Sequence, residues 1–207
     1  GVKVICYNFM PVFDWLRSDL KRAHSDGSNS LAYEDQTEQS MNPLTSELSL
    51  PGWDESYTKE QLKDLLHQYQ AISEERLWEN LRTFLEAVIP VAEESGVKMA
   101  IHPDDPPWGL FGLPRIITNE ANLNRFLKLV DRPANGLTFC TGSLGVDAHN
   151  DLPEMIRRFG SRIYFAHLRN IRRTGERSFE EVGHPTSCGS LDMYEIVKAL
   201  VESGFEG

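Results

Sequence analysis

Short runs of β-forming apolar residues alternate with amphipathic helical patterns along most of this chain. Three of the runs cover residues 97–102, 137–140 and 162–167, and each is followed by a polar loop and then by a helical pattern. Strands that alternate with helices at such spacings are typical of βα units, whose strands run parallel. The sequence therefore predicts an α/β fold built on a parallel sheet.

The clearest helical pattern covers residues 73–95. Its apolar residues recur at steps of three and four, and Ser73 followed by Glu74 and Glu75 fits an N-terminal cap with early acids. Further helices are expected over residues 57–70, 119–130, 151–159 and 191–203, the last capped by Ser190, and a first strand over residues 2–9. Residues 18–56 are polar with turn signals, which predicts an irregular excursion inside one domain that covers residues 1–207.

The composition of the chain disfavours several classes of binding partner. The formal net charge of -10 disfavours nucleic acid and anionic membranes, because binding phosphates requires a basic surface. No apolar run approaches the roughly 18 to 20 residues of a membrane span, and nothing near Gly1 reads as a cleavable signal. Three cysteines, an odd number, argue against a disulfide framework. We therefore expect a cytoplasmic protein.

Metal-ligand side chains stand at the C-terminal ends of the three predicted strands. These are His102, Cys140 and His167. Taken singly, a histidine in a turn and a small buried cysteine are ordinary residues. Because the C-terminal ends of parallel strands meet at one face, their coincidence favours a shared site for Zn, Fe(II) or Mn. A fourth ligand would come from another strand; Asp104 is the nearest candidate, although neighbours so close in sequence seldom bind the same ion.

Several longer motifs resemble those of a known family. They are Cys-Tyr-Asn-Phe-Met-Pro at residues 6–11, Ile-His-Pro-Asp-Asp-Pro-Pro at 101–107, Cys-Thr-Gly-Ser at 140–143 and Ile-Tyr-Phe-Ala-His-Leu-Arg at 163–169. In this order and spacing they resemble the mannonate dehydratases of the xylose isomerase-like superfamily. The resemblance runs nearly end to end and implies a (β/α)8 TIM barrel, of which this chain would cover the middle and be incomplete at both ends.

The resemblance also implies a function. It implies a metal-dependent hydro-lyase that converts D-mannonate to 2-keto-3-deoxy-D-gluconate in hexuronate (glucuronate) catabolism, acting as a homo-oligomer (dimer). His102, Cys140 and His167 would hold Mn²⁺ or Fe²⁺. A family Asp ligand in an Arg-Pro-Asp-His-Gly type motif, together with the acid and base groups, would come after Gly207, so the catalytic residues stay unknown here.

Four further residues are expected to contact the substrate or the metal ligands. They are Asn8, Asp104, Arg115 and Arg169. Either arginine could pair with the substrate carboxylate or form a structural ion pair. Two other interpretations of the function remain open. One is a metal-dependent sugar isomerase or epimerase of the same superfamily, which Cys140 disfavours because such sites prefer carboxylates. The other is an inactive fragment with an incomplete metal site.

Overall fold

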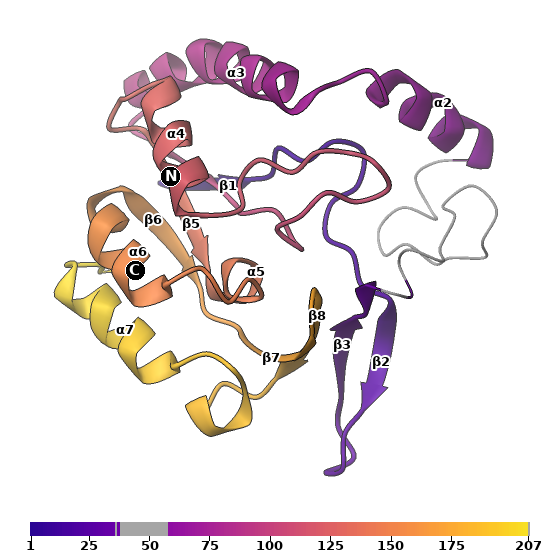
Figure 1. Cartoon of the computed structure of the whole chain (residues 1–207). Coiled ribbons are helices and arrows are strands. Elements are labelled where there is room, and N and C mark those ends of the chain that lie inside the picture. The colour runs from indigo at the N-terminus through magenta and orange to yellow at the C-terminus, as the bar shows by residue number, and fades with distance from the viewer. Residues whose placement is uncertain (36, 38–57, 207) are drawn as a thin grey trace.

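A computed structural model describes residues 1–35, 37 and 58–206 of the chain (Figure 1). Within them, four parallel strands form one sheet in the order β1-β4-β5-β6. Their bounds are β1 (Val4–Tyr7), β4 (Lys98–Ile101), β5 (Asn135–Cys140) and β6 (Ile163–His167). The predicted α/β fold with a parallel sheet is confirmed.

Helices lie between and after these strands in the chain, and several of them lie on the outer side of the parallel sheet (Figure 1). They are α2 (Lys59–Tyr69), α3 (Glu74–Glu94), α4 (Glu120–Leu129), α5 (Thr141–Gly145), α6 (Leu152–Phe159) and α7 (Met193–Glu202). Ser73 caps α3 as predicted, because its side chain accepts a hydrogen bond from the Arg76 amide. The predicted cap of α7 is wrong: Asp192 accepts from the Glu195 amide, while Ser190 accepts from the backbone N–H of Arg173.

Helix α3 supplies much of the apolar core. Its residues Trp78, Leu81, Leu85 and Ile89 are each at most 1% exposed. They recur every three or four positions, so they occupy one face of the helix. Burial of each aliphatic side chain stabilises the fold by about 1.5–3 kcal/mol. Strand β5 is buried along its whole length, which fixes its C-terminal end at Cys140 firmly in the core.

A second sheet of the described residues is antiparallel and has the order β2-β3-β8-β7. Its strands are β2 (Asp19–Ala23), β3 (Asn29–Tyr33), β7 (Asn170–Gly175) and β8 (Ser178–Val182). These strands were not predicted from the sequence: the first pair falls in the predicted excursion over residues 18–56, and the second in the polar loop predicted after residue 167. Position 36 and positions 38–57, which include the rest of that excursion, lie outside the described residues.

Charge pairing explains why these strands lack a clear apolar alternation. Arg172 on β7 lies opposite Glu180 on β8 and donates a hydrogen bond to it at 3.1 Å. Such opposite-charge pairs across two strands stabilise a sheet without apolar side chains. The strands also pair over long sequence distances, as β3 does with β8.

An aromatic cluster joins the antiparallel sheet to the loop that follows β4. Tyr33 stacks on Phe179 with ring centroids 5.8 Å apart, and Trp108 of the loop donates a hydrogen bond to the Tyr33 hydroxyl at 3.3 Å. The sheet therefore holds the segment in which the residues after His102 lie. None of the helices in the described part of the chain has the length and apolar character needed to cross a lipid bilayer.

Candidate metal centre

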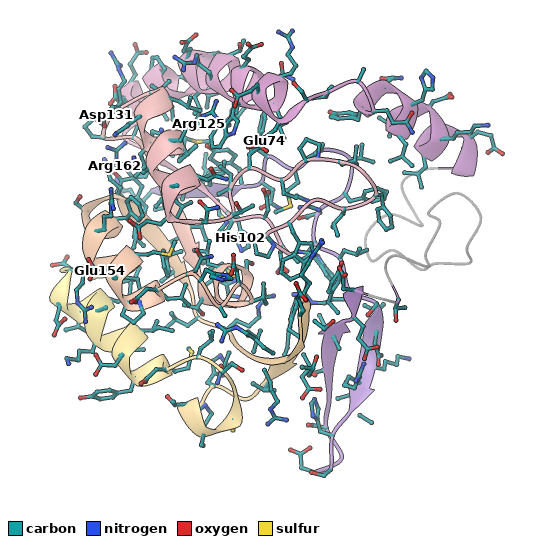
Figure 2. All side chains as sticks on the ribbon, viewed as in Figure 1. Glu74, His102, Arg125, Asp131, Glu154 and Arg162 are labelled. Atoms are coloured by element: carbon teal, nitrogen blue, oxygen red, sulfur yellow. The ribbon has the colours of Figure 1, made fainter. Side chains whose placement is uncertain are left out.

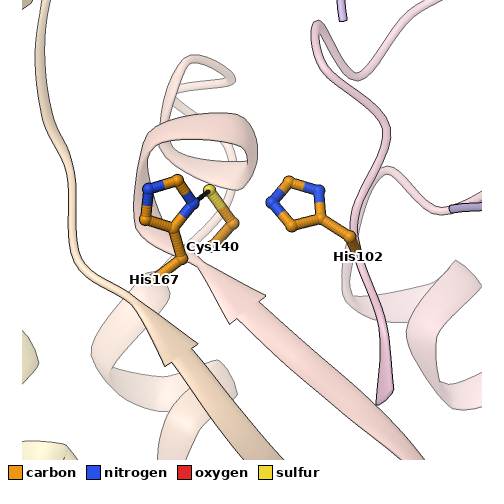
Figure 3. A group of neighbouring side chains, drawn as sticks. All are labelled: His102, Cys140 and His167. Carbon is orange, nitrogen blue, oxygen red and sulfur yellow. Dashed lines mark hydrogen bonds between the residues drawn. The ribbon is translucent and has the colours of Figure 1, made fainter. Parts of the chain in front are cut away.

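The ends of β4, β5 and β6 bring His102, Cys140 and His167 together (Figure 3). In the register of the sheet Cys140 lies directly opposite His167, and His102 follows the last residue of β4. The backbone N–H of His102 donates to the Tyr7 carbonyl at 2.8 Å, which ties this position to β1 as well. In Figure 2, His102 lies in the interior of the molecule, whereas Glu154 lies at its periphery.

The spacing of the three side chains suits one cation. One ligand atom from each residue lies within 4.8 Å of the other two, and Cys140 Sγ is 3.4 Å from His167 Nδ1. Bonds of about 2.0–2.3 Å to a common ion put neighbouring ligand atoms roughly 3–3.6 Å apart. The Cys140–His167 pair already has this separation.

Local contacts orient the donors. His102 Nδ1 donates to the Pro103 carbonyl at 2.7 Å, which leaves Nε2 of the neutral ring with its lone pair. Cys140 is buried, His102 is half-buried and His167 is exposed, so the group is open on one side. Two imidazoles and a thiolate with an open side fit a catalytic Zn, Fe or Mn site.

Electrostatics favours the thiolate of Cys140. Burial alone would raise the pKa of the thiol, but hydrogen bonds with His102 and His167 and the charge of Arg169 outweigh burial and hold that pKa well below its usual value. Burial lowers the pKa of His102, and here too the contact with Cys140 outweighs it, with a net upward shift. The thiolate is the form of cysteine that binds metals.

A ring of four charged residues lies behind the three candidate ligands, and of these four only Arg169 was among the predicted site residues. Arg17 donates to both carboxylate oxygens of Asp105, at 2.8 and 3.1 Å, and to Glu181 at 2.9 Å. Arg169 completes the ring with hydrogen bonds to Asp105 and Glu181. We call these four residues the charge ring. Burial would raise the pKa of Asp105, but the two arginines outweigh it and hold that pKa well below its usual value.

The Cys-Thr-Gly-Ser motif connects the candidate metal centre to the charge ring. Thr141 Oγ1 accepts a hydrogen bond from the Arg169 amide and donates to its carbonyl, both at 2.8 Å. A Cβ at Gly142 would lie 2.0 Å from Arg169 Nε, so only glycine leaves room for this guanidinium. Ser143 Oγ lies 3.2 Å from Cys140 Sγ and 3.1 Å from Asp105 Oδ2. The motif therefore supplies one candidate ligand and three residues that seat Arg169 beside it.

Two of the four expected substrate contacts are buried in the protein. Asp104 is 0% exposed and accepts hydrogen bonds from the amides of Ile116 and Ile117. Arg115 donates to the carbonyls of Phe13 and Asp14, and its guanidinium lies 3.9 Å from the Asp104 carboxylate. Burial raises the pKa of Asp104 to about 6 in spite of Arg115. These contacts favour a structural ion pair that joins two loops.

The other two expected contacts lie nearer the open face. Asn8 is exposed, follows the last residue of β1 and donates to Asp14 Oδ1 at 2.8 Å. Because Tyr7 is in register with Ile101, Asn8 is next to His102 at the ends of neighbouring strands. Arg169 is half-buried in the charge ring, two residues after His167.

Comparisons with known proteins agree with one another. A family model described as D-mannonate dehydratase (UxuA) matches residues 1–207. "Mannonate dehydratase 2" of Halalkalibacterium halodurans is 57% identical over 209 residues, which cover 100% of this chain and 61% of the relative. The crystal structure of mannonate dehydratase from Streptococcus suis serotype 2 matches with a TM-score of 0.89 and 45% identity, over 100% of this chain and 56% of that one.

A more distant structure shares the fold alone. It is a xylose isomerase domain protein from Planctomyces limnophilus, with a TM-score of 0.50 and 17% identity over 66% of this chain and 45% of that one. The parallel sheet with its helices thus has the fold of xylose isomerase-like TIM barrels, as the sequence predicted. The chain spans about 60% of the length of the curated relatives that it matches.

Proposed function

The chain belongs to the D-mannonate dehydratase (UxuA) family, and from that premise we propose that its protein is a metal-dependent hydro-lyase that converts D-mannonate to 2-keto-3-deoxy-D-gluconate in hexuronate catabolism. The observation that carries the proposal is the convergence of His102, Cys140 and His167 at three strand ends. This donor set, in a chain matched by the family over residues 1–207, supports a metal centre as the place of the reaction.

We propose that His102, Cys140 and His167 hold the ion, either Mn²⁺ or Fe²⁺. When bound, the ion supplies Lewis-acid stabilisation of the negative charge that develops on the substrate as the C2 proton leaves. The Cys140 thiolate supports this assignment, because it is the form of cysteine that binds metals. The contact of His102 Nδ1 with the Pro103 carbonyl supports it as well, because it leaves Nε2 as the nitrogen that would bind the ion once the ring gives up its proton. A site built on a thiolate also favours a dehydratase over an isomerase or epimerase of this superfamily.

Dehydration breaks the C2–H and C3–O bonds, releases water and leaves an enol that becomes the 2-keto acid. Such a reaction needs a base for the C2 proton and an acid for the departing hydroxyl, each of which typically contributes about 10²- to 10⁴-fold. We assign neither group to the described residues. Asn8 and Arg169 are the two proposed substrate contacts, since they lie at strand ends beside the donor set, while Asp104 and Arg115 hold the surrounding loops together.

A direct assay tests the proposal. The purified protein is incubated with D-mannonate and Mn(II), and the 2-keto-3-deoxy acid is quantified beside a sample treated with a chelator. We expect product that requires the metal. The matched controls are another aldonic acid and an aldose substrate. Isomerised aldose without keto-deoxy acid would replace the dehydratase by a sugar isomerase, and no turnover of any substrate would favour an inactive fragment.

The cellular setting is part of the same proposal. We propose a cytoplasmic homo-oligomer, a dimer, that acts on a small molecule and binds neither nucleic acid nor membrane. The net charge of -10 supports the last part, because an acidic surface repels phosphates.

A further inference from the structure

Ser143 is the residue through which the charge ring reaches the metal centre. Ser143 is fully buried, and its hydroxyl oxygen lies 3.2 Å from Cys140 Sγ. We propose that Ser143 is a positioning residue that donates a hydrogen bond to the Cys140 sulfur, orients it toward His102 and His167, and thereby tightens binding of a divalent cation. The inference rests on the proposed metal centre and adds a role that the donor set alone does not contain.

The hydrogen bonds around Ser143 determine where its proton goes. Arg169 Nη2 donates to Ser143 Oγ at 3.2 Å, so one lone pair of the hydroxyl is occupied. The single hydroxyl proton then has two acceptors within reach, Cys140 Sγ and, at 3.1 Å, Asp105 Oδ2. Asp105 already accepts hydrogen bonds from Arg17 and Arg169, which donate to both of its oxygens. The Asp105 oxygen nearest Ser143, Oδ2, already accepts from both arginines, so we infer that the hydroxyl proton points to the buried sulfur.

The charge ring makes this arrangement rigid. Arg169 contacts Asp105 and Glu181 through its two terminal nitrogens and crosses Gly142, where a Cβ would displace it. Thr141 fixes the backbone of Arg169 on the other side. Ser143 therefore contacts a guanidinium that two carboxylates hold in place, and its oxygen lies within hydrogen-bonding distance of Cys140.

A hydrogen bond to a metal ligand changes the metal site in two measurable ways. Partners of this kind contribute about 10- to 100-fold to metal affinity, because they orient the ligand. A hydrogen bond to a thiolate sulfur also tunes the electronic properties of the metal–sulfur bond, because it withdraws electron density from the sulfur. The second effect distinguishes a hydrogen bond from mere packing.

Ser143→Ala tests the inference with Co(II) as the probe. Co(II) bound to cysteine sulfur gives a thiolate-to-metal charge-transfer band. We expect the variant to bind Co(II) about 10- to 100-fold more weakly, and its band to move to longer wavelength, because the sulfur without its hydrogen bond is a better electron donor. Thr138→Val is the matched control: Thr138 is buried on β5, the strand that ends at Cys140, but its hydroxyl donates to the Ala100 carbonyl and lies near Cys6 Sγ. It should leave affinity and band unchanged.

A second pair of variants covers the case in which Ser143→Ala does not fold. Ser143→Thr and Ser143→Val have nearly the same shape and differ in the hydroxyl. Threonine should keep the wild-type band and valine should shift it. Equal bands and affinities in this pair, or an unshifted band with unchanged affinity in Ser143→Ala, would overturn the role of Ser143 while the metal centre stands. A wild-type protein that binds Co(II) without a thiolate band would remove Cys140 from the metal site, and the inference with it.

Discussion

Replacing Cys140 with serine is expected to abolish tight binding of the divalent metal and to lower kcat/KM for D-mannonate by about 10³-fold. The serine hydroxyl stays protonated at neutral pH and is a poor metal ligand, whereas the Cys140 thiol has a pKa well below its usual value. Lewis-acid stabilisation contributes several kcal/mol to such a reaction, and each 1.36 kcal/mol is a factor of ten in rate. Metal content after dialysis and the rate of keto-deoxy acid formation are the two measurements.

The control for this substitution is Cys188→Ser. Cys188 is a half-buried free cysteine outside the metal centre, and its backbone carbonyl accepts a hydrogen bond from Arg172. The control should retain stoichiometric metal and activity within about twofold of wild type, as expected for a surface change away from functional features. Stoichiometric metal in Cys140→Ser would show that the sulfur is no ligand and would leave the two histidines without their proposed partner.

Replacing Asp105 with alanine is expected to lower the free energy of unfolding by about 3–5 kcal/mol. The change leaves Arg17 and Arg169 facing each other with Glu181 as the remaining carboxylate of the charge ring, and uncompensated buried charges are costly. Arg17 has a fully buried side chain, so water cannot replace the lost partner. Denaturant unfolding at neutral pH measures the loss. Glu93→Ala, which breaks the exposed ion pair with Arg132, should cost less than about 1 kcal/mol.

Asp105→Ala should also change how the free energy of unfolding depends on pH in acid. The pKa of Asp105 is lower in the folded protein than its usual value of 3.8, so the folded state holds fewer protons than the unfolded state. Its contribution is therefore fully present above the unfolded pKa and is lost as pH falls below 3.8 toward the folded pKa. Unfolding free energies between about pH 5 and pH 3 should fall less steeply in Asp105→Ala than in wild type. Equal slopes would mean that Asp105 is not ionised within the ring.

Local patterns were enough to predict the parallel sheet and the convergence of three side chains at its edge. The strands that end at His102, Cys140 and His167 are apolar runs bounded by turns, and their common direction follows from the helices between them. Once the strands run parallel, their ends meet, so the convergence of the three side chains needs no knowledge of tertiary contacts. The helix that begins after Ser73 was equally clear from its caps and its period.

The antiparallel sheet and the charge ring could not be predicted in the same way. Strand β3 pairs with β8, and Arg17 pairs with Asp105 across 88 positions in the chain, so nothing in either segment identifies its partner. Asp104 and Arg115 were predicted to contact the substrate or the metal ligands, and the structure places them in a buried pair. Asp105 was not among the predicted site residues, because its role depends on two distant arginines.

The charge ring has a consequence for the kinetics of folding. Its members come from four segments, and Arg17 meets Glu181 across 164 positions of the chain. Closing such long loops costs conformational entropy before any contact is gained, so we expect the ring to form after the local βα units. Interactions made late in folding stabilise the native state against unfolding without accelerating folding. We therefore expect the four charges behind the candidate metal centre to slow its loss by unfolding without accelerating its formation.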